Sequence, residues 1–211
     1  MRITKLLFFS LITLVGCGGA HRPASSVVKV VAPISVPFDY VGPSWIRVPA
    51  DIGGVASHLI FDTGGGITIV SKTLCKQMKC VPDGTASGKR MSGQTIEVKM
   101  SRVPSITIAG HRVVNARVAV LDTSDLLHPD LGVDGVAGLD LFRDQAVTID
   151  YAQQRFVIEN AASLAERHRA GTTTKMHIEN DGPSTVVYLP LLLAPQAPPL
   201  EMEEGARPET K

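Results

Sequence analysis

The sequence has few cysteines, few aromatic residues and almost no net charge, and each shortage excludes a class of protein. Its 211 residues include 3 cysteines, too few for a disulfide scaffold and without the paired spacing of a zinc site. The formal net charge is +1, so the chain lacks the basic excess that nucleic-acid binding needs. The 6 histidines are scattered without metal-ligand spacing, so we expect no metal and no cofactor. We expect His58 and His111 to be exposed strand or turn residues.

Glycine and proline are abundant instead. The 19 glycines and 14 prolines, beside 5% aromatic residues, favour a loop-rich β protein over a helix bundle. Apolar residues recur with a period near two in short segments separated by turn residues, which predicts an all-β fold. The expected strands are residues 27–34, 45–48, 56–61, 67–70, 94–100, 105–109, 113–121, 147–149 and 155–158. Helices are minor: residues 71–79, a turn after Asp140, and residues 161–169. Hairpin turns are expected at Gly110 and at residues 151–154.

Residues 1–16 have the pattern of an export signal. Arg2 and Lys5 form a short positive region, and residues 6–15 are apolar apart from Ser10 and Thr13. This apolar stretch is too short to span a bilayer as a mature helix. The sequence therefore predicts a secretory signal.

The signal runs into Leu14-Val15-Gly16-Cys17, which resembles the bacterial lipobox. In that motif lipoprotein signal peptidase cuts before an acylated cysteine. The resemblance implies that Cys17 is the lipidated first residue of a protein anchored at the cell envelope. Gly18 resembles the second residue of lipoproteins sorted to a Gram-negative outer membrane, facing the periplasm. The alternative is an ordinary secretory signal followed by an unrelated cysteine.

Export also bears on the other two cysteines, Cys75 and Cys80. Cys75 lies within the expected helix over residues 71–79, and Cys80 lies at its exit. In an oxidising compartment such a pair forms a local disulfide, and the alternative is two unpaired, buried thiols.

Two short motifs carry the candidate chemistry. Asp62-Thr63-Gly64 follows the apolar residues 59–61 and precedes a second apolar strand. Further along the chain, Val136, Ala137 and Gly138 are two apolar residues and a glycine before a helical turn. Taken separately, the triplet is also a common turn between strands, and the glycine a simple strand bend.

Together the two motifs resemble the retropepsin-like aspartic proteases, specifically their exported bacterial members, over about residues 30–160. The resemblance implies a closed β-barrel of the acid protease type with a ψ-shaped active site. In that site Val136, Ala137 and Gly138 cross the loop that carries Asp62. It also implies an aspartic endopeptidase that acts on a peptide or protein substrate, with Asp62 as the catalytic residue and with Thr63 and Gly64 supporting the loop.

Aspartic chemistry needs two carboxylates that share one proton, so that one takes a proton from water while the other polarises the scissile carbonyl. The rival second motif, Asp122-Thr123-Ser124, has serine in place of glycine and no apolar-apolar-Gly segment after it. We expect Asp122 or Thr123 to cap a short turn over residues 124–127 instead. A symmetric homodimer, with Asp62 from each subunit, is therefore expected.

A flap over such a site is expected at residues 88–95, with Met91 and Gly93 near its tip. An ordinary surface hairpin is the alternative. Residues 17–29 are expected to be a flexible tether and residues 194–211 a disordered tail.

Two features depart from the family pattern. Gly65 and Gly66 follow the triplet, where the family usually has alanine or serine. Some related bacterial proteins also carry a second, degenerate repeat, whereas here Leu193 is followed by a tail that looks unlike any protease half. Residues 161–193 are expected to form a helix and an extra hairpin around Asn180-Asp-Gly182. These departures leave a second hypothesis, a catalytically inactive retropepsin-like lipoprotein that binds peptides or serves assembly, shortened from a two-repeat ancestor.

Overall fold

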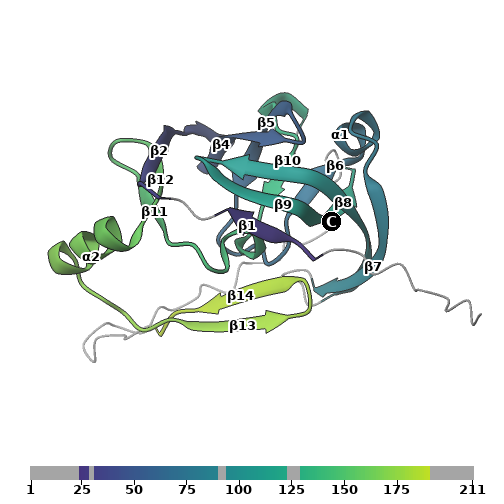
Figure 1. Ribbon diagram of the computed structural model, residues 1–211. Helices are drawn as coiled ribbons and strands as arrows, with labels where there is room; N and C mark the ends of the chain where they lie inside the picture. Colours follow the sequence, from purple (N-terminus) through teal and green to yellow (C-terminus); the bar gives the residue numbers. More distant parts are fainter. Residues whose placement is uncertain (1–23, 29–30, 90–93, 123–128, 191–211) are drawn as a thin grey trace, which may run out of the picture.

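The computed structural model describes residues 24–28, 31–89, 94–122 and 129–190 (Figure 1). The fold is mostly β, which confirms the predicted class. The strands are β1 (Ser26–Val28), β2 (Ile34–Pro37), β3 (Asp39–Val41), β4 (Trp45–Ile52), β5 (Val55–Phe61), β6 (Ile69–Ser71), β7 (Val81–Lys89), β8 (Thr95–Ile108), β9 (His111–Leu121), β10 (Gly135–Ala137), β11 (Val147–Asp150), β12 (Arg155–Ile158), β13 (His177–Asp181) and β14 (Ser184–Tyr188). The helical elements are α1 (Lys72–Gln77), α2 (Ala161–Ala170) and the short 3-10 helices η2 (Pro129–Leu131) and η3 (Leu139–Phe142).

The main sheet closes into a barrel. Its strands follow the order β1-β9-β6-β10-β5-β4-β8-β7, and β8 pairs with β9 as well as with β4. This second pairing joins the two ends of the path from β9 to β8, so the sheet has no open edge there. A separate three-stranded sheet contains β11, β12 and β2, and β13 pairs with β14 alone.

The core fills the barrel with side chains from alternate positions of its long strands. Fully buried members are Val48, Ile52, Leu59, Val103, Ile106, Ile108 and Val118. Beside them, Phe61 packs edge-on against Phe156 and Phe142, with ring centroids 4.9 and 5.6 Å apart. Phe61 is the last residue of β5, so this aromatic cluster holds β12 and η3 directly behind the loop that begins at Asp62.

The three hairpins predicted from turn residues are confirmed by the strand pairing. Ile108 lies opposite His111, Asp150 opposite Arg155, and Asp181 opposite Ser184. In the last of these, Gly182 adopts a φ of 53°, which glycine tolerates without the steric cost of a side chain.

Several segments differ from the expectation, and β3 was not expected at all. Ser26–Val28, assigned to the flexible tether, pairs with β9 as a strand, and the strand expected over residues 27–34 is divided between β1 and β2. The strands expected on either side of Pro104 are one continuous strand, β8, because the ladder to β9 passes over Pro104 and needs no N–H from it. Strand β7 was missed, since its glycines and weak alternation do not resemble a strand.

The expectation for His111 was wrong, whereas His58 is exposed as predicted. His111 is only 2% exposed, and its ring stacks on Phe142 with centroids 5.3 Å apart. Its Nε2 lies 2.7 Å from the carbonyl oxygen of Leu141, an acceptor, so Nε2 carries the proton. Burial lowers the pKa of His111 below its ordinary value of 6.5. The ring is therefore a neutral member of the core.

The buried ring makes the stability sensitive to acid. Because the pKa of His111 is lowered by folding, the unfolded chain binds more protons below pH 6.5, and stability is lost as pH falls towards the folded-state pKa. We expect His111→Gln, whose amide retains a donor for Leu141, to lose less free energy of unfolding than the parent chain between pH 7 and pH 5. Urea unfolding at these pH values measures the difference. Parallel pH profiles would contradict this account.

Candidate active site

The loop after β5 presents Asp62 at the surface, and three hydrogen bonds hold this residue in place. The N–H of Asp62 donates to the carbonyl oxygen of Ala137 at 3.0 Å, and the N–H of Gly65 donates to the carbonyl oxygen of Asp62 at 3.1 Å. The N–H of Gly64 donates to Oδ1 of Asp62 at 2.9 Å. Asp62, Thr63 and Gly64 are all exposed. The carboxylate is thus oriented by its own loop and open to solvent.

Strand β10 crosses between the two strands that flank this loop. Val136 and Ala137 pair in parallel with Ile60 and Phe61 of β5, and Val136 also pairs with Ile69 of antiparallel β6. Strand β10 therefore lies between β5, which precedes the loop, and β6, which follows it. Figure 1 shows β10 lying in the sheet between its neighbours.

Glycine is required at the point where the crossing strand leaves the sheet. A Cβ on Gly138 would lie 2.7 Å from the carbonyl oxygen of Gly65 and 2.8 Å from the carbonyl carbon of Ile67, closer than side-chain atoms pack. The N–H of Leu139 donates to that same oxygen of Gly65 at 2.8 Å. The backbone of the crossing segment therefore touches the Asp62 loop directly.

A buried polar pair lies behind the contact. Thr68 is fully buried, and its Oγ1 donates to Oδ1 of Asp140 at 2.7 Å and accepts from the N–H of Gly138 at 3.1 Å. Burial raises the pKa of Asp140 from 3.8 to about 6, although the bonds from Thr68 and the charge of Arg143 act in the opposite direction. The sequence analysis did not place Thr68 or Asp140 in the site. The available signal was an acidic residue between the apolar Leu139 and Leu141.

The C-terminal hairpin meets the other side of the loop. The N–H of Thr185 donates to the carbonyl oxygen of Gly66 at 2.9 Å. A Cβ on Gly66 would collide with Oγ of Ser184. Arg143 Nη2 donates to the carbonyl oxygens of residues 182, 183 and 184, at 2.7 Å for Pro183. The second glycine after the triplet, a departure from the family pattern, therefore leaves room for this hairpin.

The remaining candidate residues fall into two groups. Cys75 and Cys80 are joined by a disulfide at the end of α1, where Cys75 packs against the core. Cys17, Met91, Gly93 and Thr123 lie outside the described residues. Strands β7 and β8, which lead into the expected flap, pair up to Lys89 and Thr95.

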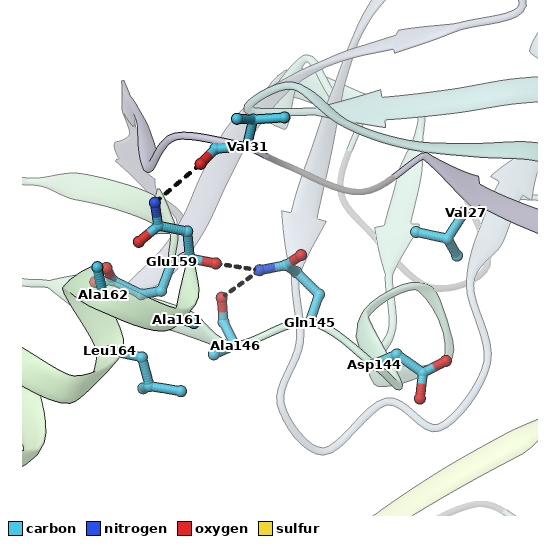
Figure 2. A pocket seen from close by; sticks show the side chains of 10 residues that line it. Val27, Val31, Asp144, Gln145, Ala146, Glu159, Ala161, Ala162 and Leu164 are labelled. Atoms are coloured by element: carbon cyan, nitrogen blue, oxygen red, sulfur yellow. Dashed lines mark hydrogen bonds between the residues drawn. The ribbon is translucent and has the colours of Figure 1, made fainter.

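A hollow of about 840 Å³ lies between β1 and α2, away from the Asp62 loop (Figure 2). Part of its polar lining is bonded within the protein: Gln145 Nε2 donates to the carbonyl oxygens of Ala146 and Glu159, and the Asn160 amide donates to the carbonyl oxygen of Val31. None of the predicted site residues lines it.

Among the described residues, no three His, Cys, Asp or Glu side chains are grouped so that they could hold a metal ion. The described part of the chain also contains no helix with the length and apolar character needed to cross a membrane.

Comparison with known proteins agrees with the geometry. Residues 48–141, the segment that holds both motifs, match the family model described as aspartyl protease. The chain is also similar to the crystal structure of a retropepsin-like aspartic protease from Rickettsia conorii, at 15% sequence identity and a TM-score of 0.43. That similarity covers 64% of this chain and 92% of the other. No curated protein matches the sequence.

The raised pKa of Asp140 predicts a pH-dependent cost of folding. Its ionised form is disfavoured in the folded chain, so the contribution of Asp140 to stability is greatest below pH 3.8 and declines as pH rises towards 6. Asp140→Asn retains an acceptor for Thr68 without the charge. We expect the variant to gain on the order of 2 kcal/mol relative to the parent chain between pH 4 and pH 7. Urea unfolding at each pH measures this gain, and a constant difference would contradict it.

Proposed function

We propose that this protein is a membrane-anchored aspartic endopeptidase whose two catalytic aspartates are the Asp62 residues of a homodimer. The observation that carries the proposal is the position of Asp62, at the exposed tip of a loop that β10 holds from behind. The match of residues 48–141 to the aspartyl protease family, which covers the loop and the crossing strand, supports it.

The loop geometry suits a carboxylate that must hold one orientation. Gly64 directs one carboxylate oxygen, and the bonds to Ala137 and within the loop hold the backbone. Groups held in place before the substrate binds need little reorganisation during reaction. Only Gly64 hydrogen-bonds to the Asp62 side chain among the described residues, so the carboxylate retains the capacity to bind water.

A second copy is needed because, among the described residues, no other aspartate is bonded to the exposed Asp62 carboxylate. Asp122, the rival candidate, forms an ion pair with Lys72 at 3.6 Å. A two-fold axis beside Asp62 would bring the same loop from another chain opposite the first. Thr63, exposed next to Asp62, is then positioned to reach the opposite loop.

In such a dimer the two carboxylates share one proton, because two carboxylates within hydrogen-bond distance of each other cannot both be ionised. The ionised aspartate takes a proton from water, whose oxygen attacks the carbonyl carbon of the peptide. The protonated aspartate gives its proton to the carbonyl oxygen. The tetrahedral intermediate then breaks its C–N bond as the amine leaving group gains a proton from the site. An extended substrate would lie under the hairpin of β7 and β8.

The anchor is proposed from Cys17, which lies outside the described residues. Strand β1 begins at Ser26, so only the segment between these residues separates the lipid from the barrel. At about 3.4 Å per residue this segment spans at most about 30 Å. The enzyme would therefore work close to the membrane surface.

A second candidate function is peptide binding or assembly without catalysis. The observation that favours it is the C-terminal hairpin, which lies against the Asp62 loop at Gly66 and falls outside the matched residues 48–141.

The catalytic proposal predicts that Asp62→Asn abolishes cleavage. Loss of the acid and base function costs a factor of at least about 100. The full chain, purified in detergent, is mixed with a peptide library from pH 4 to pH 8 and the products are identified by mass spectrometry. Asp51→Asn is the matched control, since Asp51 is also exposed and its Oδ1 also accepts from a glycine N–H, that of Gly54 at 3.1 Å.

Cleavage by the parent chain and by Asp51→Asn, but not by Asp62→Asn, is the expected result. Equal cleavage by all three would show that another group or a contaminant is responsible. A folded parent chain that binds peptides without cutting them would favour the second candidate function.

The anchor proposal predicts that Cys17→Ala releases the protein from membranes. A thioether-linked lipid provides the anchoring, and the variant has no thiol to acylate. Labelling of cells with a clickable palmitate analogue, followed by membrane fractionation, measures both effects. Cys75→Ala serves as the control for loss of a cysteine elsewhere. Unlabelled parent protein, or a Cys17→Ala variant that stays in the membrane fraction, would refute the anchor.

A further inference from the structure

The Asp62 loop is open at one end and covered at the other. Residues 62–64 are exposed, whereas Gly65 and Gly66 are half-buried. The covering segment is the turn of the β13–β14 hairpin, where the N–H of Thr185 donates to the carbonyl oxygen of Gly66 at 2.9 Å. Figure 1 shows this hairpin along one side of the molecule, apart from the two larger sheets. A segment of the chain itself therefore occupies the loop next to the exposed carboxylate.

The hairpin is held in this position near its turn. Nη2 of Arg143 donates to the carbonyl oxygens of residues 182–184. Thr185 at this end of β14 is only 4% exposed, whereas Tyr188 at the other end is 51% exposed. Two sets of hydrogen bonds, one from Arg143 and one to Gly66, therefore hold the turn against the loop.

The contact lies close to the carboxylate along the loop. The N–H of Gly65 donates to the carbonyl oxygen of Asp62, which is the hydrogen bond of a four-residue turn. Such a turn brings its first and last Cα atoms within about 7 Å, and one more residue adds about 3.8 Å. The Cα of Gly66 is therefore at most about 11 Å from that of Asp62. An extended peptide covers this distance in about three residues.

A substrate that runs along this loop would meet the hairpin turn. Extended peptides are bound by pairing their main-chain groups with open main-chain groups of the protein. At the covered end of the loop the carbonyl oxygen of Gly65 already accepts the N–H of Leu139, and that of Gly66 accepts the N–H of Thr185. The exposed residues 62–64 are thus the part of the loop that a peptide can reach.

We propose that residues 182–185, which we call the cleft cap, close the end of the substrate-binding cleft at Gly66. The enzyme would then bind about three extended residues on each side of the cleaved bond. The inference rests on the proposed function, in which a two-fold axis places a second Asp62 loop, with its own cap, opposite the first. Its substrates are short peptides, or loops of a protein chain that bend away on both sides of the cleaved bond.

Arg143 is the residue that positions the cleft cap. It directly follows η3, whose first residue, Leu139, donates to Gly65. One short segment thus holds the loop at one point and the hairpin turn at the next. Arg143 would act on the reaction through the cap, so its loss should change the preferred length of the substrate.

Two variants loosen the cap by different means. Arg143→Gln removes the charge-assisted bonds to the turn. Thr185→Pro removes the N–H that bonds to Gly66, and proline is tolerated there because this N–H points away from β13. Arg155→Gln is the matched control, since Arg155 Nη2 also donates to a main-chain carbonyl, that of Ser35 at 2.8 Å in the three-stranded sheet.

Two peptide libraries measure the accessible length of the cleft. One has six randomised residues with blocked ends, and the other has the same six residues with four threonines added at each end. The full chain in detergent is mixed with each library, and initial cleavage rates are measured by mass spectrometry. Binding is measured separately by equilibrium dialysis in chains that also carry Asp62→Asn, so that it does not depend on cleavage. Circular dichroism checks the fold.

The decisive quantity is the gain in cleavage and binding that the longer library gives over the shorter one. We expect this gain to be at least about tenfold greater in Arg143→Gln and Thr185→Pro than in the parent chain and Arg155→Gln. The added residues then reach main-chain groups that the cap covers, and two further hydrogen bonds account for a factor of this size. A general loss of stability would lower cleavage of both libraries alike and leave their ratio unchanged.

The two variants also check each other. Arg143→Gln removes a charge that acts on Asp140, whereas Thr185→Pro leaves that charge in place, so agreement between them excludes an effect through Asp140. If Thr185→Pro does not fold, Arg143→Gln decides the question.

The remaining outcomes separate this inference from the proposed function. Cleavage with the same gain in all four chains would overturn the cap and leave the peptidase in place. An equal increase in Arg155→Gln would show a general loosening of the fold and overturn the cap as well. If no chain cleaves either library but the bound fractions follow the expected pattern, the cap stands and the catalytic assignment fails. Neither binding nor cleavage by any chain would refute both.

Discussion

The structure depends on the close approach of two backbone segments, the loop after β5 and the end of β10. Gly138 and Gly65 come so near that a single Cβ on Gly138 would fill the space between them. This contact lets Ala137 bond to Asp62 and Leu139 bond to Gly65. The crossing strand therefore supports the carboxylate from below with main-chain atoms, whose positions are less mobile than those of side chains. The aromatic cluster of Phe61, Phe142 and Phe156 packs behind the same crossing.

The buried pair of Thr68 and Asp140, behind this contact, costs free energy of folding when Asp140 is ionised. The carboxyl group of Asp140 is taken out of water to accept the hydroxyl of Thr68, and its raised pKa measures the penalty for its charge. The same hydroxyl accepts the N–H of Gly138, which would otherwise be buried without a partner. The hydroxyl of Thr68 thus links Gly138, at the end of β10, to Asp140 in η3.

The hairpin of β13 and β14 contacts the outer side of the Asp62 loop, again through main-chain atoms beside a glycine. Gly66 lacks a side chain where Ser184 and Thr185 arrive, and Arg143, directly after η3, binds three carbonyl oxygens of the hairpin turn. Elements within and after the family-matched residues 48–141 therefore converge on one short loop. Residues outside the match belong to the candidate site as much as those inside it.

The sequence by itself determined the features that depend on local patterns. Alternating apolar residues indicated most strands, and glycines and Asn180-Asp-Gly182 indicated the turns. The resemblance of the two motifs to those of retropepsin-like proteases implied which segment crosses the Asp62 loop. Only the tertiary structure decided which distant residues meet. Thr68 and Asp140 are 72 positions apart, and His111 lies under Leu141, 30 positions away. Periodicity reports which face a residue occupies relative to its neighbours in the chain, whereas these contacts follow from closure of the barrel. For the same reason a histidine beside a turn is buried, and a glycine after the triplet makes room for a hairpin more than a hundred residues later.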